Sequence, residues 1–334
     1  MSLTNDTPTI RIRSEVQALR DNLNTQVLGQ EDLVSRLLVA LLADGHLLVE
    51  GAPGLAKTRA VKALASGIEG DFCRLQFTPD LLPGDLTGTD VYHPDTGSFT
   101  FQPGPLFHPL ILADEINRAP AKVQSALLEA MGEHQITIGG KTYPLPELFL
   151  VMATQNPIEQ EGTYPLPEAQ LDRFLMYVKI DYPKASIEHD ILMLARREAA
   201  GIRTPQSVTS PPHKILSQRA LFDARQQVLN VHTSDALASY LVDLIVATRD
   251  PRRYSDDLAR WLRFGASPRA TLALDRCSKA LAWLDGRDYV TPEDIHLIAH
   301  DVLRHRVLLT FEAEAEGISV DTFLDELLRL VALP

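Results

Sequence analysis

The sequence predicts an α/β fold with a parallel sheet in its first half, followed by a smaller domain made of helices. In the first half, short apolar runs of strand length alternate with helix-like stretches, which is typical of a parallel sheet with helices on both faces. The strand signals stop after Ile180, and mostly helix-like patterns follow. A chain of 334 residues is long enough for two domains of ordinary size.

Five segments of the first half are predicted as strands of the parallel sheet, because most of them are short uninterrupted apolar runs. They are Leu47–Val49, Phe72–Gln76, Pro109–Ala113, Phe149–Thr154 and Leu175–Ile180. Gln30–Ala43 carries its leucines on one face and is predicted as an amphipathic helix. Another helix is predicted over Thr58–Ser66.

Two β-hairpins are predicted as insertions in this alternation. The first consists of Thr89–Tyr92, the turn Pro94–Gly97 and Ser98–Phe101. The second consists of Gln135–Ile138, the turn Gly139–Gly140 and Lys141–Tyr143. Two glycines are a favoured two-residue hairpin turn. On the residues alone, both could equally be ordinary surface hairpins.

The second half is predicted to contain four longer helices. They are Ser234–Arg249, Ser267–Gly286, Thr291–Val307 and Ser319–Ala332. Ser267-Pro268 and Thr291-Pro292 each look like an N-cap followed by a proline in the first turn. Proline and glycine between residues 182 and 216 predict a linker. The expected domain limits are therefore 1–181, 182–216 for the linker, and 217–334.

Composition restricts the class of protein. The net charge is −12, with 44 acidic against 32 basic residues, which disfavours general nucleic-acid binding. The two cysteines, Cys73 and Cys277, have no paired spacing, as expected in a reducing cytosol. Met1–Arg20 lacks the apolar core of a signal peptide, and no apolar run approaches membrane-spanning length. We expect a soluble, cytoplasmic protein with no membrane insertion.

One segment has the pattern of a phosphate-binding loop. It reads Gly51-Ala52-Pro53-Gly54-Leu55-Ala56-Lys57-Thr58 and lies between an apolar strand and a helix. Backbone N–H groups of such a turn point at one place and suit a polyphosphate. Lys57 is expected on the β- and γ-phosphates, and the Thr58 hydroxyl on Mg²⁺. Ala56 replaces the second glycine of the pattern, at little cost if its φ stays negative. A chance glycine turn is the alternative.

Two carboxylates follow the third predicted strand. Asp114 and Glu115 come directly after Pro109–Ala113, at the end of a strand where open α/β sheets bind ligands. We expect Asp114 to hold Mg²⁺ through water and Glu115 to polarise the attacking water. The alternative is that both residues only cap the following helix.

Polar residues at the ends of other strands are weaker candidates. Asn156 follows Phe149–Thr154 and could orient the lytic water or touch the γ-phosphate, or it could simply form a turn before Pro157. Arg173 precedes Leu175–Ile180, and an isolated arginine is usually a solvated surface residue. His296 and His300 are four residues apart on one predicted helix, but no third ligand is evident, so a structural or surface role is expected.

Together these motifs resemble AAA+ ATPases, and among them the MoxR family. The matching segments, in the order shown by the family, are Val27–Gln30, Gly51–Thr58, Leu112–Ala119, Ala153–Pro157, Glu168–Phe174 and Ser267–Arg269. The two hairpins resemble insertions that distinguish MoxR proteins, magnesium chelatase and related ATPases. Ala56 in place of glycine is usual for MoxR proteins.

The resemblance implies a role for each matching position. Asn156 would be sensor 1, Arg173 the finger that reaches a neighbour's ATP, and Arg269 sensor 2. In AAA+ proteins a polar residue near the position of Gln76 can hold the catalytic glutamate in an idle orientation, although a plain strand-end glutamine is equally compatible. The residues expected to contact nucleotide are Val27, Leu28, Gly29, Gly51, Ala52, Pro53, Gly54, Leu55, Ala56, Lys57, Thr58 and Arg59.

The resemblance also implies a Mg²⁺-dependent ATPase that assembles into a homo-oligomeric ring, a hexamer by expectation. Such a ring would remodel or mature client proteins, with metal cofactor insertion as one form of this work. A protein with a von Willebrand factor A domain is the expected partner. The client itself is not revealed by the sequence.

Three other classes stay open. The first is a nucleic-acid motor, because MCM-type helicases share the inserted hairpins. The acidic balance disfavours it, as does Lys141 being the only basic residue of Gln135–Tyr143. The second is a small-molecule kinase, which would need an acceptor pocket. The third is a catalytically silent scaffold, which is disfavoured because it would not need Lys57, Asp114 and Glu115.

Overall fold

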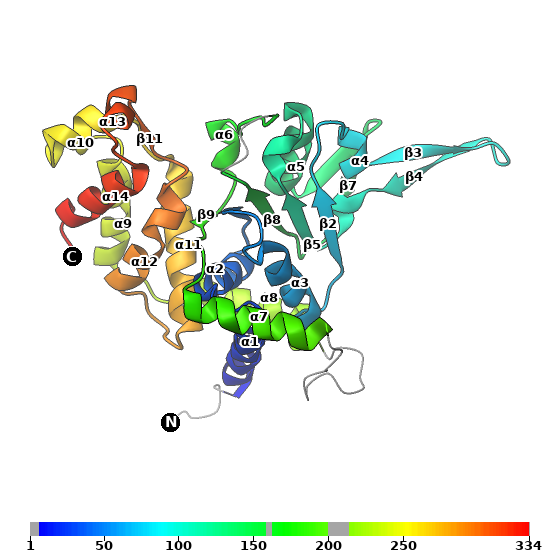
Figure 1. Cartoon of the computed structure of the whole chain (residues 1–334), viewed down its shortest axis with the longest axis horizontal. Helices are drawn as coiled ribbons and strands as arrows, with labels where there is room; N and C mark the ends of the chain where they lie inside the picture. The colour runs from blue at the N-terminus through cyan, green and yellow to red at the C-terminus, as the bar shows by residue number, and fades with distance from the viewer. Residues whose placement is uncertain (1–6, 158–161, 200–213, 334) are drawn as a thin grey trace. The chain divides into compact units, whose positions relative to one another are not determined.

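A computed structural model describes residues 7–157, 162–199 and 214–333 of the chain (Figure 1). Its central sheet has five strands in the order β2-β5-β8-β1-β9. These strands are β1 Leu47–Glu50, β2 Phe72–Gln76, β5 Leu110–Asp114, β8 Leu150–Gln155 and β9 Met176–Lys179. Pairing of β5 with both β2 and β8 is parallel. The predicted α/β fold is confirmed, and each predicted strand is present within one or two residues.

Burial along the strands explains their sequences. Every residue of β5 is buried, and so is all of β8 except its last residue, because each has a strand on either side and helices over both faces. β2 lies at the edge of the sheet and is only partly buried. This position accommodates the polar side chains of Arg74 and Gln76 on a strand.

Helices alternate with these strands along the first part of the chain. They are α1 Thr7–Gln26, α2 Glu31–Leu42, α3 Lys57–Gly67, α4 Pro83–Thr87, α5 Ala121–Glu133, α6 Glu168–Leu171, α7 Ala185–Ala199 and α8 Gln218–Leu229, with short 3₁₀ turns at Pro105–Phe107 and Ile116–Arg118. The sequence analysis missed α1, which buries Val16, Leu19 and Leu23 along one face. It also placed a linker where α7 lies.

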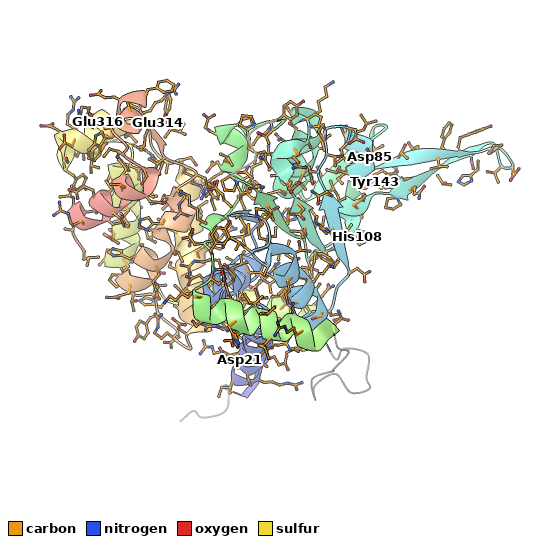
Figure 2. The ribbon with its side chains drawn as sticks, in the orientation of Figure 1. Asp21, Asp85, His108, Tyr143, Glu314 and Glu316 are labelled. Carbon is orange, nitrogen blue, oxygen red and sulfur yellow. The ribbon has the colours of Figure 1, made fainter. Side chains whose placement is uncertain are left out.

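Both predicted hairpins are present. They are β3 Gly88–His93 with β4 Ser98–Pro103, and β6 Gln135–Ile138 with β7 Lys141–Pro144. Gly139 and Gly140 have φ angles of 57° and 82°, as a two-residue turn with two left-handed positions requires. Phe101 of β4 stacks on Tyr143 of β7 with ring centroids 4.1 Å apart, so the two hairpins contact each other. Tyr143 is labelled in Figure 2. The rest of β3 and β4 projects away from the sheet (Figure 1).

The end of the chain is mainly helical, as predicted. Its elements are α9 Asp235–Ala247, η4 Pro251–Arg253, α10 Asp256–Trp261, β10 Leu262–Phe264, α11 Pro268–Leu284, α12 Pro292–Leu303, β11 Leu308–Leu309, α13 Phe311–Ala315 and α14 Val320–Leu330. The Ser267 hydroxyl accepts a hydrogen bond from the Arg269 N–H, which confirms the predicted N-cap. The short antiparallel pair β10–β11 was not predicted. The sequence of β10, Leu262–Phe264, has only three residues, which is too short to give a strand signal.

Two compact units can be distinguished by their internal contacts. The first contains residues up to Leu38, Val49–Tyr164 and Lys179–Phe222. The second contains Val39–Leu48, Pro165–Val178 and the chain from Asp223 onward. The linear domain limits expected from the sequence stay predictions. Among the helices of the described residues, none is both long enough and apolar enough to cross a bilayer.

Replacing Leu112 with alanine should destabilise the fold strongly. Leu112 is fully buried in the middle of β5, and removing a core leucine side chain typically costs about 2–5 kcal/mol. Urea unfolding followed by circular dichroism measures this loss. Leu82→Ala, at a leucine with 65% of its surface exposed, is the matched control and should change the free energy of unfolding by less than about 0.5 kcal/mol. Equal losses in the two variants would contradict this account of the core.

Candidate nucleotide-binding site

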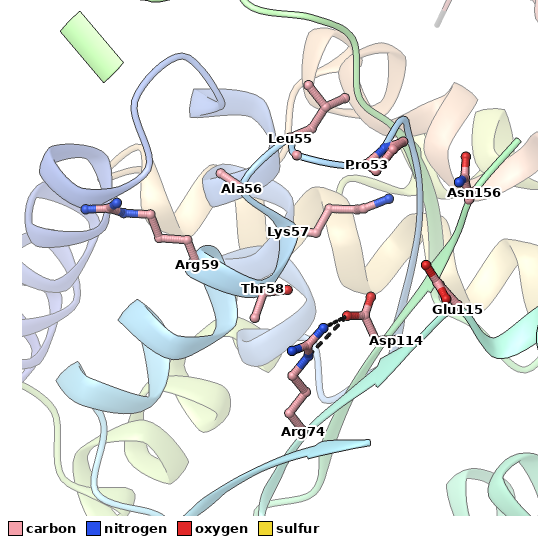
Figure 3. A pocket seen from close by; sticks show the side chains of 11 residues that line it. Pro53, Leu55, Ala56, Lys57, Thr58, Arg59, Arg74, Asp114, Glu115 and Asn156 are labelled. Atoms are coloured by element: carbon pink, nitrogen blue, oxygen red, sulfur yellow. Dashed lines mark hydrogen bonds and ion pairs between the residues drawn. The ribbon is translucent and has the colours of Figure 1, made fainter. Parts of the chain in front are cut away.

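A cavity of about 370 Å³ lies in the first unit, at the carboxyl ends of the sheet strands (Figure 3). Its lining residues are Pro53, Gly54, Leu55, Ala56, Lys57, Thr58, Arg59, Arg74, Asp114, Glu115 and Asn156. They come from the loop after β1, from β2, and from the ends of β5 and β8. Parallel strands end at the same edge of the sheet, which is why these separate segments meet. The cavity therefore unites most of the residues predicted for the phosphate end of the nucleotide.

The amino end of α3 faces this cavity without a side-chain cap. Ala56 occupies the N-cap position and makes no capping hydrogen bond. The first backbone N–H groups of a helix have no partner within the helix and carry its positive dipole end. Ala56, Lys57 and Thr58 line the cavity at this point, so the helix end can bind the oxygens of a phosphate.

The expectation for Ala56 was wrong in one respect. Its φ is 59° and its ψ is 14°, so this residue adopts the left-handed conformation and not a negative φ. The chain needs this conformation to turn from Gly54-Leu55 into α3. The left-handed conformation of an alanine is unfavourable by roughly 1–2 kcal/mol, because its Cβ lies close to the following carbonyl oxygen. Local strain of this kind is concentrated at functional sites.

Lys57 is the lysine of the cavity. Its Nζ donates a hydrogen bond of 2.6 Å to the Gly51 carbonyl oxygen. Burial lowers the pKa of the ammonium below its ordinary value, and the negative charges of Asp114, Glu115 and Glu50 act in the opposite direction. The side chain is thus a desolvated cation held beside the loop, where an anionic ligand gains the most from it.

Asp114 is held at both carboxylate oxygens. Oδ1 accepts a hydrogen bond of 2.7 Å from the Thr154 hydroxyl. Oδ2 accepts from Arg74, whose Nη2 and Nε lie 2.6 and 3.1 Å away (Figure 3). The Thr154 hydroxyl oxygen accepts in turn from the Glu115 N–H at 2.9 Å. This small network fixes the carboxylate at the end of β5.

Glu115 is also held, by a hydrogen bond and an ion pair to the same oxygen. Its Oε2 lies 2.7 Å from Nε2 of Gln76 and 3.1 Å from Nε of Arg118. Its backbone is left-handed, with φ 59° and ψ 51°. That strained conformation turns the chain sharply between β5 and the 3₁₀ turn Ile116–Arg118. This hydrogen bond between Gln76 and Glu115 is the contact expected if Gln76 holds the glutamate in an idle orientation.

The cavity suits a magnesium ion carried by a nucleotide. The Thr58 hydroxyl and the Asp114 carboxylate line the same space and are oxygen donors, which a hard cation prefers. Among the described residues, no group of three or more His, Cys, Asp or Glu could form a complete metal cage. Mg²⁺ is normally bound by one or two protein oxygens together with water and substrate phosphates, so the residues present fit this ion.

A second hollow in the first unit adjoins the loop and is mainly apolar. Its lining residues are Gln26, Leu28, Gln30, Gly54, Leu55, Ala56, Arg59, Pro183, Ile191 and Leu194. Val27, Leu28 and Gly29 were expected to contact the nucleotide. Leu28 lines this hollow, whereas Val27 is in the core and Gly29 forms a turn with φ 74°. Ile191 and Leu194 of α7 were missed, although their spacing of three is a helical signal that could have placed them on one face.

The remaining predicted residues divide between the units. Asn156 is buried and lines the cavity. Arg173 lies between α6 and β9, and Arg269 lies in the first turn of α11; both belong to the second unit. Nη1 of Arg269 is 3.6 Å from Oδ2 of Asp172.

The two candidate histidines each have a protein partner in the second unit. His296 Nε2 lies 2.7 Å from the Tyr240 hydroxyl. His300 Nε2 lies 2.9 Å from Oδ1 of Asp325. Burial lowers the pKa of His296.

Comparison with known proteins identifies the family. The family described as ATPase family associated with various cellular activities (AAA) matches residues 46–176, and the AAA lid domain matches residues 259–327. Chaperone MoxR1 of Mycobacterium tuberculosis is 47% identical over 309 residues, which are 92% of this chain and 79% of that protein. The chain belongs to the MoxR family of AAA+ ATPases.

Other relatives support the same assignment over nearly the whole length. Protein MoxR of Paracoccus denitrificans is 33% identical over 325 residues, which are 93% of this chain and 94% of that protein. The crystal structure of a protein from Cytophaga hutchinsonii matches with a TM-score of 0.89 at 45% identity, over 98% of each chain. The family resemblance of the sequence is thereby confirmed, and this MoxR protein is an ATPase with an AAA domain followed by a lid domain.

The left-handed backbone of Ala56 gives a prediction on stability. Ala56→Gly should raise the free energy of unfolding of the nucleotide-free protein by up to about 1 kcal/mol, because glycine adopts positive φ without steric cost. Ala63→Gly, in the interior of α3, should lower it by about 1 kcal/mol, because glycine is unfavourable inside a helix. Urea unfolding of the three proteins measures both changes. A loss of stability in both variants would show that Ala56 is not strained.

Proposed function

We propose that this MoxR protein hydrolyses Mg²⁺-bound ATP in the cavity of the first unit and uses the energy, as a ring of identical subunits, to remodel client proteins. The observation that carries the proposal is the pair Asp114 and Glu115, which shares one cavity with Lys57 and the uncapped end of α3. A phosphate site, a place for a cation and a base occur there together. The name Chaperone MoxR1, given to a relative of 47% identity, supports client remodelling.

The residues predicted from the sequence for the phosphate end of the nucleotide then have defined roles. Lys57 and the N–H groups of α3 bind the phosphates, and Thr58 and Asp114 hold Mg²⁺, which neutralises phosphate charge when bound. Glu115 accepts a proton from the attacking water. Asn156 donates or accepts a hydrogen bond at the γ-phosphate or at this water. Leu28 and the α7 residues of the apolar hollow contact the base of the nucleotide.

Glu115 has to leave its present partners before it can act as a base. Its Oε2 accepts a hydrogen bond from Gln76 and forms an ion pair with Arg118, and an oxygen held in both ways is a poor proton acceptor. We propose that this is the idle orientation and that client or partner binding releases it.

The proposed ring assembly is supported by family membership and by two arginines of the second unit. We propose that Arg173 is the finger completing a neighbour's site and that Arg269 is sensor 2, within a ring that is a hexamer. A von Willebrand factor A domain protein is the proposed partner, and maturation of complexes that contain metal cofactors is the proposed work. The two cysteines are free thiols, which accords with a cytoplasmic location.

Two substitutions separate nucleotide binding from hydrolysis. Lys57→Ala should abolish tight nucleotide binding, because the phosphates lose the lysine in the loop. Glu115→Gln should keep binding and reduce turnover by about 10²–10⁴-fold, since an amide cannot act as a general base. Fluorescent-nucleotide binding and phosphate release measure the two properties. Undiminished turnover by Glu115→Gln would show that another group is the base. The same variant, loaded with ATP, is the reagent for isolating the client.

ATP hydrolysis should require assembled subunits. An arginine finger contributes roughly 10³–10⁵ in rate, so Arg173→Ala should lose that much turnover and still bind ATP. Mixing Arg173→Ala with Lys57→Ala subunits should restore part of the activity, because some interfaces then combine an intact loop with an intact finger. Turnover per subunit should also rise steeply with protein concentration. Turnover that is independent of concentration, or no rescue despite proven co-assembly, would refute the role of Arg173.

A further inference from the structure

Arg74 is a charged residue of the cavity for which the proposed mechanism has no role. It lies on the edge strand β2, two residues before Gln76, so both side chains are on the same face of the strand. In the parallel pairing with β5, Gln76 is opposite Asp114. Arg74 therefore approaches Asp114 along the face of the sheet.

The guanidinium makes two connections at once. Nε and Nη2 both donate to Oδ2 of Asp114, and Nη2 also donates to Oε1 of Gln76 at 3.1 Å. Nearly half of the Arg74 side chain is exposed (46%), whereas that of Asp114 is only 11% exposed. The arginine can thus move toward solvent, but the aspartate cannot follow it.

This geometry makes Arg74 and a metal ion competitors. Oδ1 of Asp114 is taken by the Thr154 hydroxyl and Oδ2 by Arg74. Nε and Nη2 of Arg74 fill both acceptor positions of Oδ2, so a cation, or the water bound to it, can reach that oxygen only if Arg74 gives up its place there. Both are positively charged, so each also weakens the attraction of the carboxylate for the other.

The second connection extends this competition to Glu115. The Gln76 amide accepts from Arg74 through Oε1 and donates to Glu115 through Nε2. Because the two ends of the amide differ, the donor at Oε1 fixes which end faces the glutamate. When Arg74 leaves Asp114, Gln76 loses that donor, and its hold on Glu115 weakens.

We propose that Arg74 is a positioning residue that occupies the metal-binding oxygen of Asp114 and, through Gln76, holds Glu115 in its idle orientation. Displacement of Arg74 by the metal then couples arrival of Mg²⁺-bound nucleotide to a weaker hold on the base, so that client or partner binding can release it. This inference rests on the proposed function of Asp114 and Glu115. It adds Arg74 to the residues that control Glu115. It also identifies loss of the hydrogen bond from Arg74 as the event that weakens the hold of Gln76 on Glu115.

The first test measures magnesium binding without hydrolysis. Thermal unfolding is followed at a fixed, saturating ADP concentration while Mg²⁺ is titrated. The Mg²⁺ concentration that gives half of the stabilisation should fall about fivefold in Arg74→Met, because a partly exposed ion pair is typically worth about this factor. Arg74→Lys keeps a cation at this position and should stay close to the wild type.

Arg118→Met is the matched control for the loss of positive charge. Arg118 pairs with Glu115 and has no hydrogen bond or ion pair to Asp114 among those described. A general electrostatic effect would lower the Mg²⁺ requirement equally in both variants and would overturn the inference, as would an unchanged or higher requirement in Arg74→Met. Should the methionine variant not fold, Arg74→Gln replaces it with the same expected direction. If Mg²⁺ does not stabilise even the wild type with ADP, the proposed metal site itself is wrong.

The second test measures the connection to Glu115. Basal turnover is compared for Gln76→Ala, Arg74→Met and the double variant at saturating ATP and at the Mg²⁺ concentration that half-saturates the wild type, because saturating Mg²⁺ would already displace Arg74 from Asp114. Both single variants should raise turnover about two- to fivefold, in keeping with the modest strength of single hydrogen bonds. The double variant should be no faster than the faster single variant, because the two residues act in one chain of contacts. Additive increases would show that Arg74 does not act through Gln76.

Discussion

The register of three parallel strands supports the site. Pairing of β2 with β5 places Gln76 opposite Asp114, and pairing of β5 with β8 places Ala113 opposite Ala153. The hydroxyl of Thr154 thereby reaches Oδ1 of the aspartate, and the Gln76 amide reaches Glu115. Shifting any of these strands by one residue would turn its side chains to the opposite face. The apolar cores of β5 and β8 therefore do more than stabilise the sheet: by fixing the register they also set the distances among the polar groups at its edge.

Each of the two carboxylates at the end of β5 is paired with an arginine before any ligand is considered. Lys57 is near Asp114 and Glu115, while Arg74 and Arg118 each neutralise one of the two carboxylates. A largely buried carboxylate without such a partner would be costly. A polyphosphate with its metal ion carries both signs of charge. Ion pairs within the protein can therefore be replaced by ion pairs with the ligand, with little change in the net charge of the site. Such an exchange would allow the two proposed catalytic carboxylates to be held firmly in one state and to be available in another.

The sequence predicted the elements of the site better than their connections. The strands and the loop Gly51–Thr58 were recognisable because a strand, a glycine-rich turn and a helix follow one another within a few residues. The left-handed φ of Ala56 was not predicted, since alanine carries no signal for that conformation. Arg74 was missed entirely, because its partner Asp114 is 40 residues away and only the pairing of two strands brings them together. Helix α7 lies where proline and glycine nearby suggested a linker, so its apolar contacts at the hollow were also missed.

In the second unit, Asp172 joins parts of the chain that are far apart in sequence. It accepts hydrogen bonds from Arg306 at 2.7 Å and from Ser267 at 2.9 Å, beside the ion pair with Arg269. Arg306 is almost fully buried, burial lowers the pKa of its guanidinium, and its opposite charge partner is Asp172. Loss of one member of such a pair strands the other charge in a dry interior, typically at about 3–5 kcal/mol. Replacing Asp172 or Arg306 alone would therefore destabilise the second unit, so the residue next to the proposed finger depends on a partner that lies 134 residues further along the chain.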